Sequence, residues 1–289
     1  GVGGAGGSAE VIAPISKVFL ILMENHNWAQ IKGSGNAPTI NALLAEGAHA
    51  EQYKNPPGLH PSEPNYLWLE AGTAFGIKDG LPPAVNHQSS TQHLVTLLEQ
   101  AGKSWKSYQE DISGTDCPLV NVKKYAPKHN PMVFFDDITN VNDPASPKCI
   151  AHVRPFREID QDLLTGQVAD YSFLTPNLCH DMHDSCAPLF DPIAQGDQWL
   201  AAELPKLRAS KAYAEGAVIF IVWDEGPGIS DGPVGMIALG NKVKVGYENQ
   251  IPYTHSSTLR TVQEIFGVVP LLGDAANAAD LSDFFTSFP

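Results

Sequence analysis

The residues best suited to chemistry in this sequence follow two apolar runs. The run VIFIVW leads directly into Asp224 and Glu225, and the run VFLILM leads into Glu24 and Asn25. An unbroken apolar run rich in β-branched residues is typical of a strand buried on both faces of a sheet. In open parallel sheets ligands bind beyond the carboxyl ends of the strands, so the two endings are expected to converge. Three carboxylates and an amide placed together would repel one another without a cation between them, so the sequence predicts an oxygen-rich metal site.

Ser62 is the candidate nucleophile. It lies within HPSEPNY, just before a helix predicted from Tyr66 to Gly72. Backbone N–H groups and the helix dipole at such a point favour an anion. A serine there is more often an N-cap, but Asn65 can point its amide at the same anion, and flanking prolines stiffen the loop. A serine hydroxyl needs a base or a metal to become a nucleophile, and the acidic strand ends could hold that metal.

These residues belong to a longer series of motifs. The series is ENH at Glu24 to His26, HPSEPNYL at His60 to Leu67, WKSYQED at Trp105 to Asp111, KHNP at Lys128 to Pro131, the run from Pro176 to Asp184, WDEG at Trp223 to Gly226, and THSSTLRTVQEIFG at Thr254 to Gly267. It resembles the phosphoesterase family of bacterial and fungal acid phosphatases and phospholipases C, from residue 17 to about residue 270. HPSEPNY is the most specific motif. The resemblance implies an alkaline-phosphatase-like α/β/α fold.

The resemblance also assigns roles to residues. It implies that Ser62 is the nucleophile and that Asn65 binds phosphate. The implied metal ligands are all oxygen donors: Glu24, Asn25, Ser62, Asp224 and Glu225. Such a set favours one hard divalent ion, Mg²⁺, Ca²⁺ or Mn²⁺, over Zn²⁺. Longer family members often continue Asp-Glu with His-Gly-Gly, whereas this chain has Gly-Pro-Gly, so a nearby histidine contact is absent.

Two loop histidines are expected around the phosphate. His129 and His183 each lie in a family-like motif and could donate to a transferring oxygen or protonate the leaving group, although a structural role is the alternative for any one histidine. Weaker candidates for substrate contact or for orienting other site residues are His60, Lys128, Asp184 and His255. A loop lysine such as Lys128 is more often simply solvated, and the helix that follows His255 has an apolar face to pack.

The four cysteines predict an oxidising compartment. They lie in loop-like sequence without the close-paired C-x2-C spacing of a zinc site, which favours two disulfides in a secreted or periplasmic protein. We favour the pairs Cys117–Cys149 and Cys179–Cys186, although three connectivities are open to four cysteines. Four free thiols in a cytosolic protein is the alternative.

The elements that must position these residues alternate between strand and helix. Predicted strands are 17–23, 48–54, 104–109, 171–175, 218–223 and 234–239. Predicted helices are 38–47, 66–72, 90–102, 156–166, 199–210 and 256–267. This alternation predicts an α/β protein, a three-layer α/β/α sandwich with a mostly parallel central sheet. We expect a flexible segment at 1–10 and a single domain over 11–289. A loop-rich insertion near 111–155 is expected to be functional.

Composition limits the partners. The net charge of −14 disfavours nucleic acid, because phosphate attraction would have the wrong sign. No apolar run approaches the ~18 residues needed to span a bilayer, so stable membrane insertion is not expected, and no protein partner is implied.

Together these features predict metal-dependent hydrolysis of small phosphate monoesters through a phosphoserine intermediate. HPSEPNY and KHNP resemble the short acid phosphatases more than the longer lipases. Two alternatives stay open: a phosphodiesterase or phospholipase C, and a secreted, non-catalytic protein that binds calcium.

Overall fold

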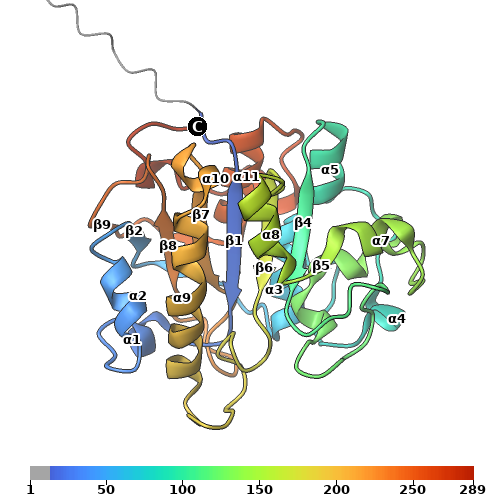
Figure 1. Ribbon diagram of the computed structural model, residues 1–289, viewed down its shortest axis with the longest axis horizontal. Coiled ribbons are helices and arrows are strands. Elements are labelled where there is room, and N and C mark those ends of the chain that lie inside the picture. The colour runs from blue at the N-terminus through green and yellow to red at the C-terminus, as the bar shows by residue number, and fades with distance from the viewer. Residues whose placement is uncertain (1–13) are drawn as a thin grey trace, which may run out of the picture.

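The computed structural model describes residues 14–289, and the flexible segment expected at 1–10 lies outside the described residues. Within the described residues an eight-stranded sheet has the order β5-β4-β6-β1-β7-β8-β2-β9, and β10 pairs with β3 beside it (Figure 1). The strands are β1 Val18–Met23, β2 Ala48–Ala50, β3 Tyr53–Lys54, β4 Trp105–Gln109, β5 Val153–Pro155, β6 Tyr171–Thr175, β7 Val218–Trp223, β8 Met236–Leu239, β9 Tyr247–Asn249 and β10 Tyr253–Thr254.

The centre of the sheet is parallel. Strand β1 pairs in parallel with β6 on one side and with β7 on the other, in a register that places Val18 beside Tyr171 and Val218. Every residue of β1 and β7 is buried, which explains why both read as unbroken apolar runs. Only β8 runs antiparallel to its neighbours β7 and β2. The predicted α/β class with a mostly parallel sheet is confirmed, and the carboxyl ends of β1, β6 and β7 share one edge.

Helices cover both faces of the sheet. In Figure 1, α8, α9 and α10 lie in front of the strands, while α3 and α11 lie behind them. The helices are α1 Trp28–Ile31, α2 Pro38–Leu43, α3 Ser62–Ala71, α4 Pro83–Asn86, α5 Leu94–Gln100, α6 Asp136–Thr139, α7 Pro147–His152, α8 Glu158–Thr165, α9 Pro192–Arg208, α10 Lys211–Ala214 and α11 His255–Phe266. The 3₁₀ helices are η1 Pro127–His129, η2 Pro131–Phe134, η3 Gly273–Asn277 and η4 Ser282–Phe284. Over residues 14–289 no helix is both long enough and apolar enough to cross a membrane.

Helix α3 begins four residues earlier than predicted. The prolines of HPSEPNY suggested a loop up to Tyr66, but Ser62 is already the first helical residue. Pro61 precedes the helix and Pro64 is its third residue, and N–H groups in the first turn have no acceptor within the helix. Neither proline therefore removes a hydrogen bond. The earlier start matters because Ser62, Asn65 and Tyr66 then share one helical face.

Other boundaries also differ from prediction. The expected strand over 48–54 divides into β2 and β3, which pair with different partners. Helix α5 is shorter than expected at its start, where Glu70 accepts the N–H of Val95. Helix α9 begins at Pro192, because Asp191 caps it by accepting from Ala194 N. The predicted loop over 111–155 contains η1, η2, α6, α7 and the edge strand β5.

Candidate active site

The carboxyl edge of the sheet gathers buried carboxylates. Glu24 follows β1, Asp181 lies in the loop after β6, and Asp224 and Glu225 follow β7. Glu24, Asp181 and Asp224 are fully buried, and Glu225 is 4% exposed. The backbone joins the three strand ends directly, since Glu24 N donates to Asp181 O at 2.7 Å and Asp224 N to Met23 O at 3.0 Å. The predicted meeting of the β1 and β7 endings is thus seen; Asn25 is half-buried at the next position.

The face of α3 meets these carboxylates. Ser62 Oγ lies 2.9 Å from Glu24 Oε2 and 3.3 Å from Glu225 Oε1. One turn later, the Tyr66 hydroxyl donates to Glu24 Oε1 at 2.7 Å. Sequence reasoning missed Tyr66; a helix beginning at Ser62 would have revealed it, because residues i and i+4 share a face. Ser62 is therefore held between two acids by a helix whose first turn faces the same edge.

The Asn65 amide lies beside the acid pair and already has hydrogen-bond acceptors. Its Nδ2 donates to Leu59 O at 2.9 Å and Pro61 O at 3.2 Å, and lies 3.4 Å from Glu225 Oε2. Its Oδ1 is buried without a partner. In this conformation the amide braces the turn before Ser62, and its proposed contact with phosphate needs one N–H to be released.

The electrostatics of the cluster fit a bound cation. Burial raises the pKa of Glu24, and burial together with the charges of Glu24 and Glu225 raises that of Asp224 well above its usual range. Burial and Glu24 raise the pKa of Glu225 to about 7. Both oxygens of Asp224 are buried without a hydrogen-bond partner. Because unpaired buried carboxylates are costly, a divalent ion bound by oxygen suits these residues.

A cationic and imidazole wall faces the carboxylates. His129 Nδ1 lies 3.1 Å from Asp181 Oδ2, and its Nε2 lies 3.1 Å from Glu24 Oε1. Burial, with the nearby charges of Lys128 and His183, holds the pKa of His129 well below its usual range. Lys128 is not simply solvated, because its Nζ lies 3.1 Å from His183 Nε2. The donor atoms of Glu24, His129 and His183 lie within 4.8 Å of one another, so nitrogen as well as oxygen donors stand near the cluster.

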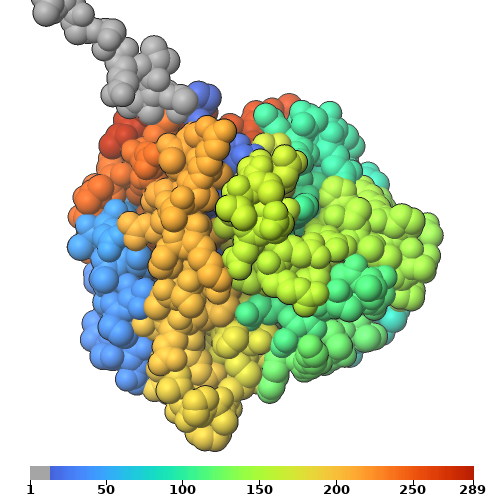
Figure 2. Space-filling view, viewed as in Figure 1, coloured from blue at the N-terminus to red at the C-terminus, as the bar shows by residue number. Residues whose placement is uncertain are grey.

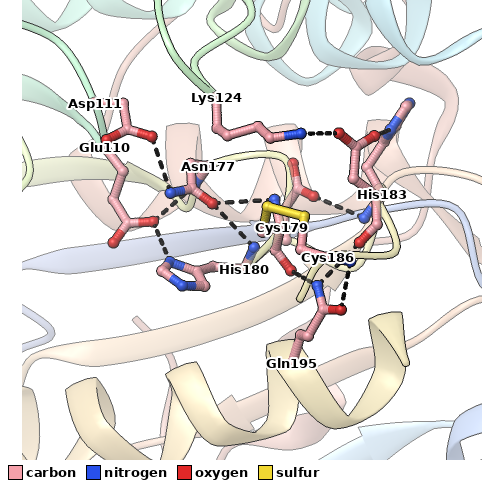
Figure 3. Close-up of a disulfide and its surroundings, with 11 residues drawn as sticks. Glu110, Asp111, Lys124, Asn177, Cys179, His180, His183, Cys186 and Gln195 are labelled. Atoms are coloured by element: carbon pink, nitrogen blue, oxygen red, sulfur yellow. Dashed lines mark hydrogen bonds and ion pairs between the residues drawn. A yellow bond between two sulfur atoms is a disulfide. The ribbon is translucent and has the colours of Figure 1, made fainter. Parts of the chain in front are cut away.

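His183 lies in a loop closed by the disulfide Cys179–Cys186, shown in Figure 3. His183 Nδ1 lies 2.8 Å from Asp184 Oδ1, and the backbone N–H of His183 donates to Asp181 Oδ1 at 2.8 Å. Gln195 of α9 fastens both ends of the loop, donating to Cys179 O at 2.7 Å and accepting from Cys186 N at 2.8 Å. The loop's continuation, coloured yellow, projects at the lower end of the molecule in Figure 2. Asp184 thus contacts the imidazole of His183 directly.

The structure also contains the disulfide Cys117–Cys149, so both cystine pairs are those that the sequence analysis favoured. No free cysteine occurs in residues 14–289. The Cys117 and Cys149 side chains are buried, whereas Cys179 and Cys186 are half-buried.

The remaining histidine candidates lie behind the acid pair. His60 Nδ1 lies 2.5 Å from Glu225 Oε2, and its Nε2 lies 2.9 Å from Asp231 Oδ1, a partner that the sequence did not reveal. His255 Nε2 lies 2.5 Å from the backbone oxygen of Asp224. Burial lowers the pKa of His255 to about 4, so it is a neutral donor that fixes the end of β7. Neither histidine lies against Ser62 in the contacts described.

Gly226 has a steric reason to follow the acid pair. A Cβ at this position would lie 2.3 Å from Asn27 Oδ1 and 2.6 Å from Ser230 O. The chain between β7 and β8 therefore folds tightly against the residues that follow β1.

A second group of potential ligands lies away from this site. His49, Glu51 and Glu248 bring their donor atoms together, but Lys32 Nζ already lies 2.7 Å from Glu51 Oε1 and 3.1 Å from Glu248 Oε2. The lysine supplies the positive charge that an ion would supply.

Comparison with known proteins identifies the group of enzymes that this site serves. The model of the "Phosphoesterase family" matches residues 35–269. The chain belongs to the phosphoesterase family. It is 31% identical over 278 residues to a phosphatidylinositol-3-phosphatase of Mycobacterium tuberculosis, covering 96% of this chain and 85% of that protein. A probable acid phosphatase of Kluyveromyces lactis is 27% identical over 88% of this chain, and an acid phosphatase of Aspergillus fumigatus is 26% identical over 93%. This phosphoesterase spans 60% of the length of each of these two fungal relatives.

Solved structures agree on the fold. The human ectonucleotide pyrophosphatase/phosphodiesterase 5 aligns with 94% of this chain at a TM-score of 0.60 and 13% identity, and all of that chain is covered. A protein of the alkaline phosphatase superfamily from Vibrio parahaemolyticus aligns with 96% of this chain and 73% of its own length at a TM-score of 0.60 and 11% identity. The expected alkaline-phosphatase-like fold is confirmed, and the phosphoesterase is a phosphoric ester hydrolase.

Proposed function

We propose that this phosphoesterase is an acid phosphatase-like enzyme that hydrolyses phosphate monoesters with Ser62 as nucleophile. The observation that carries the proposal is the position of Ser62 Oγ, 2.9 Å from Glu24 and 3.3 Å from Glu225 at the start of α3. Asp224, buried beside them with both oxygens unpartnered, supports a bound cation. Because the relatives carry the name phosphatase, they support a monoester rather than a diester as the substrate of this chain.

A divalent cation held by Glu24, Asn25, Ser62, Asp224 and Glu225 would supply a lower pKa for the serine hydroxyl and neutralise negative charge on the phosphate. The Ser62 proton passes to a neighbouring carboxylate, Glu24 or Glu225, as Oγ forms its bond to phosphorus. The bond from phosphorus to the leaving oxygen breaks in line with that attack. A water then attacks the phosphoserine and gives a proton to His183, which has lost one to the leaving group. The phosphorus–Oγ bond breaks, and Ser62 takes back the proton that the carboxylate holds.

The imidazole and ammonium wall serves the leaving group in this proposal. His183, hydrogen-bonded to Asp184 and adjacent to Lys128 Nζ, delivers the proton that the departing alkoxide needs. His129 is neutral because of its lowered pKa and so has one N–H. Burial and Glu24 raise the pKa of Asp181, so that Asp181 carries a proton and donates it to Nδ1, which leaves the Nε2–H of His129 to donate to an equatorial phosphate oxygen. Asn65 is the second donor to that oxygen, once one of its N–H groups is released from Leu59 O or Pro61 O.

The two disulfides support a secreted or periplasmic location for this activity, because cystines persist in oxidising compartments.

The test compares p-nitrophenyl phosphate with bis-p-nitrophenyl phosphate, on chelator-treated protein with single divalent ions restored. We expect metal-restored turnover of the monoester in preference to the diester. Ser62→Ala should lower kcat by roughly 10⁴-fold or more while the protein stays folded. The matched control is Ser89→Ala, an exposed serine, which should leave kcat unchanged. Undiminished turnover by Ser62→Ala would exclude it as nucleophile, and a preference for the diester would exclude the monoesterase.

A further inference from the structure

A pocket of about 690 Å³ lies directly beside the candidate site. It is lined by Gly80, Pro82, Val120, Asn121, Ala126, Pro127, Lys128 and Leu178. Three segments distant in sequence build it: the loop before α4, the segment that leads into η1, and the residue that follows Asn177 after β6. Apart from Lys128 and Asn121, the side chains in this lining carry no polar group. The mechanism proposed above does not use this pocket.

Lys128 connects the pocket with the chemistry. Its side chain lines the pocket, and its Nζ lies 3.1 Å from His183 Nε2. Leu178, on another wall, accepts the N–H of Asp184 at 2.7 Å, so the same wall continues into the loop that holds His183. A group that leaves from a phosphate near His183 therefore has the pocket as its neighbour.

The pocket walls are fixed before any substrate binds. Leu178 N donates to Lys124 O at 3.0 Å, and the Tyr125 hydroxyl donates to Pro118 O at 2.8 Å. The disulfide of Cys117 anchors the segment three residues before Val120. On the opposite wall, Asn86 Nδ2 lies 2.7 Å from Asp79 Oδ1 and 2.7 Å from Glu63 Oε1, next to Ser62. A preformed pocket binds without the cost of ordering its walls.

The apolar lining continues to the surface. Val120 is 68% exposed and Leu81, between two pocket residues, is 46% exposed. Exposed apolar side chains around a concave site mark binding of an apolar group when they cluster, whereas scattered ones carry no meaning. Here Val120 lines the pocket and Leu81 lies in sequence between its lining residues Gly80 and Pro82, and the same pocket reaches Lys128.

We propose that this pocket binds the leaving group of the substrate and that the preferred substrates are phosphate monoesters of apolar alcohols. The inference rests on the proposed monoesterase function. Phosphate occupies the polar site at Ser62, and the alkyl or aryl group enters the pocket past Lys128, where it loses contact with water. Small polar esters such as glycerol phosphate gain no binding energy from the apolar lining of the pocket.

The experiment measures kcat/KM for methyl, butyl and hexyl phosphate and for glycerol phosphate, on the metal-loaded full chain. The alkyl phosphates carry leaving groups of similar acidity, so differences report binding of the chain. Each buried methylene is worth about 0.8 kcal/mol, a factor of about fourfold. We expect hexyl phosphate to exceed methyl phosphate by about 50-fold or more, the value of burying about three of its five additional methylenes, and glycerol phosphate to resemble methyl phosphate.

Val120→Asp places a charge at the pocket entrance and should lower the hexyl-to-methyl ratio by about fourfold or more, the value of one methylene. The control is Val245→Asp, at a valine that is 75% exposed and lies on the turn before β9. This variant should leave the hexyl-to-methyl ratio unchanged. Inhibition by hexylphosphonate and methylphosphonate, which cannot be hydrolysed, should show the same ordering.

The outcomes separate the two proposals. Equal kcat/KM for all four esters, with equal inhibition by the two phosphonates, would overturn the pocket assignment while the monoesterase survives. Hydrolysis of none of the four would overturn the monoesterase and the pocket with it. A ratio unchanged by Val120→Asp would place the alkyl chain elsewhere.

Discussion

The buried His93 makes the sharpest prediction about stability, because it connects α3, which carries Ser62, with α6. His93 Nδ1 lies 2.9 Å from Glu70 Oε1 at the end of α3, and its Nε2 lies 3.0 Å from Asp137 Oδ1 in α6. The ring stacks on Phe135 with centroids 3.9 Å apart. His93 and Glu70 are 0% and 1% exposed at the side chain, whereas Asp137 is 20% exposed.

His93→Leu keeps much of the volume but leaves the buried Glu70 without its charged partner, with the N–H of Val95 still donating to it. Breaking a buried ion pair by removing one member costs about 3–5 kcal/mol, since an uncompensated charge remains. At roughly 2 °C per kcal/mol for a chain of this length, Tm should fall by about 6–10 °C at pH 7. The matched control is His87→Leu: His87 Nδ1 lies 2.7 Å from Asp136 in the same helix, but the histidine side chain is 36% exposed. An exposed pair is worth about 0–1 kcal/mol, so Tm should fall by no more than about 2 °C.

The same cluster predicts a pH dependence. Hydrogen bonds to Asp137 and Glu70 raise the pKa of His93 despite its burial, and burial raises the pKa of Glu70. In both cases the folded state binds the proton more tightly than the unfolded state, so the stability is present below the unfolded pKa and is lost as pH rises through the folded pKa. Relative to Glu70→Gln/His93→Gln, the wild type should lose stability in urea titrations between pH 5 and pH 9. A constant difference across that range, or equal Tm losses for His93→Leu and His87→Leu, would refute a charged cluster.

Three further predictions concern the site. Tyr66→Phe removes the hydroxyl that donates to Glu24; stability should fall by about 1.5–3 kcal/mol and kcat about tenfold, and an unchanged kcat in stopped assays would show that this bond does not orient Glu24. The Cys179→Ser/Cys186→Ser variant opens a loop of sequence separation 7, and its free energy of unfolding should fall by about 2.5 kcal/mol. Replacing the Cys117/Cys149 pair, with separation 32, should lower the free energy of unfolding by about 3.7 kcal/mol. If urea titration gives the reverse order, loop entropy is not the cause. When calorimetry is done on chelator-treated protein, a divalent ion added at 100 times its Kd should raise the free energy of unfolding by about 2.7 kcal/mol. Asp224→Asn should remove most of that gain. Equal gains in the wild type and the variant would place the ion elsewhere.

The central strands and their acidic endings were predictable because β1 and β7 are buried on both faces, which leaves an unbroken apolar run followed by a polar stop. The family-like motifs then pointed to Ser62, His129 and His183, and all three lie at the carboxyl edge of the sheet. The start of α3 was not predictable from proline content, since prolines in the first turn of a helix cost no hydrogen bond. Because this boundary was misplaced, the position of Tyr66 at the site was not predicted.

Partners contributed by distant loops were also beyond local patterns. Asp231 reaches His60 across 171 positions of sequence, and Glu70 reaches His93 across 23. Asp181 stood out only as one acid in a polar run, yet its backbone and side chain bind Glu24 and His129. Such pairs depend on how the helices pack, and no periodicity records that packing.

The antiparallel direction of β8 affects the carboxyl edge of the sheet, where the candidate site lies. Because β7 ends at this edge and the antiparallel β8 starts from it, residues 224–235 both begin and end there, with no helix between them. Lengthening this connection would therefore add chain at the rim of the site without disturbing either helical layer. Within it, Glu225 and Asp231 hold His60 from both sides, while Gly228 and the 87% exposed Ile229 lie between them. This short stretch is where a change in length would alter substrate access and leave the folded scaffold intact.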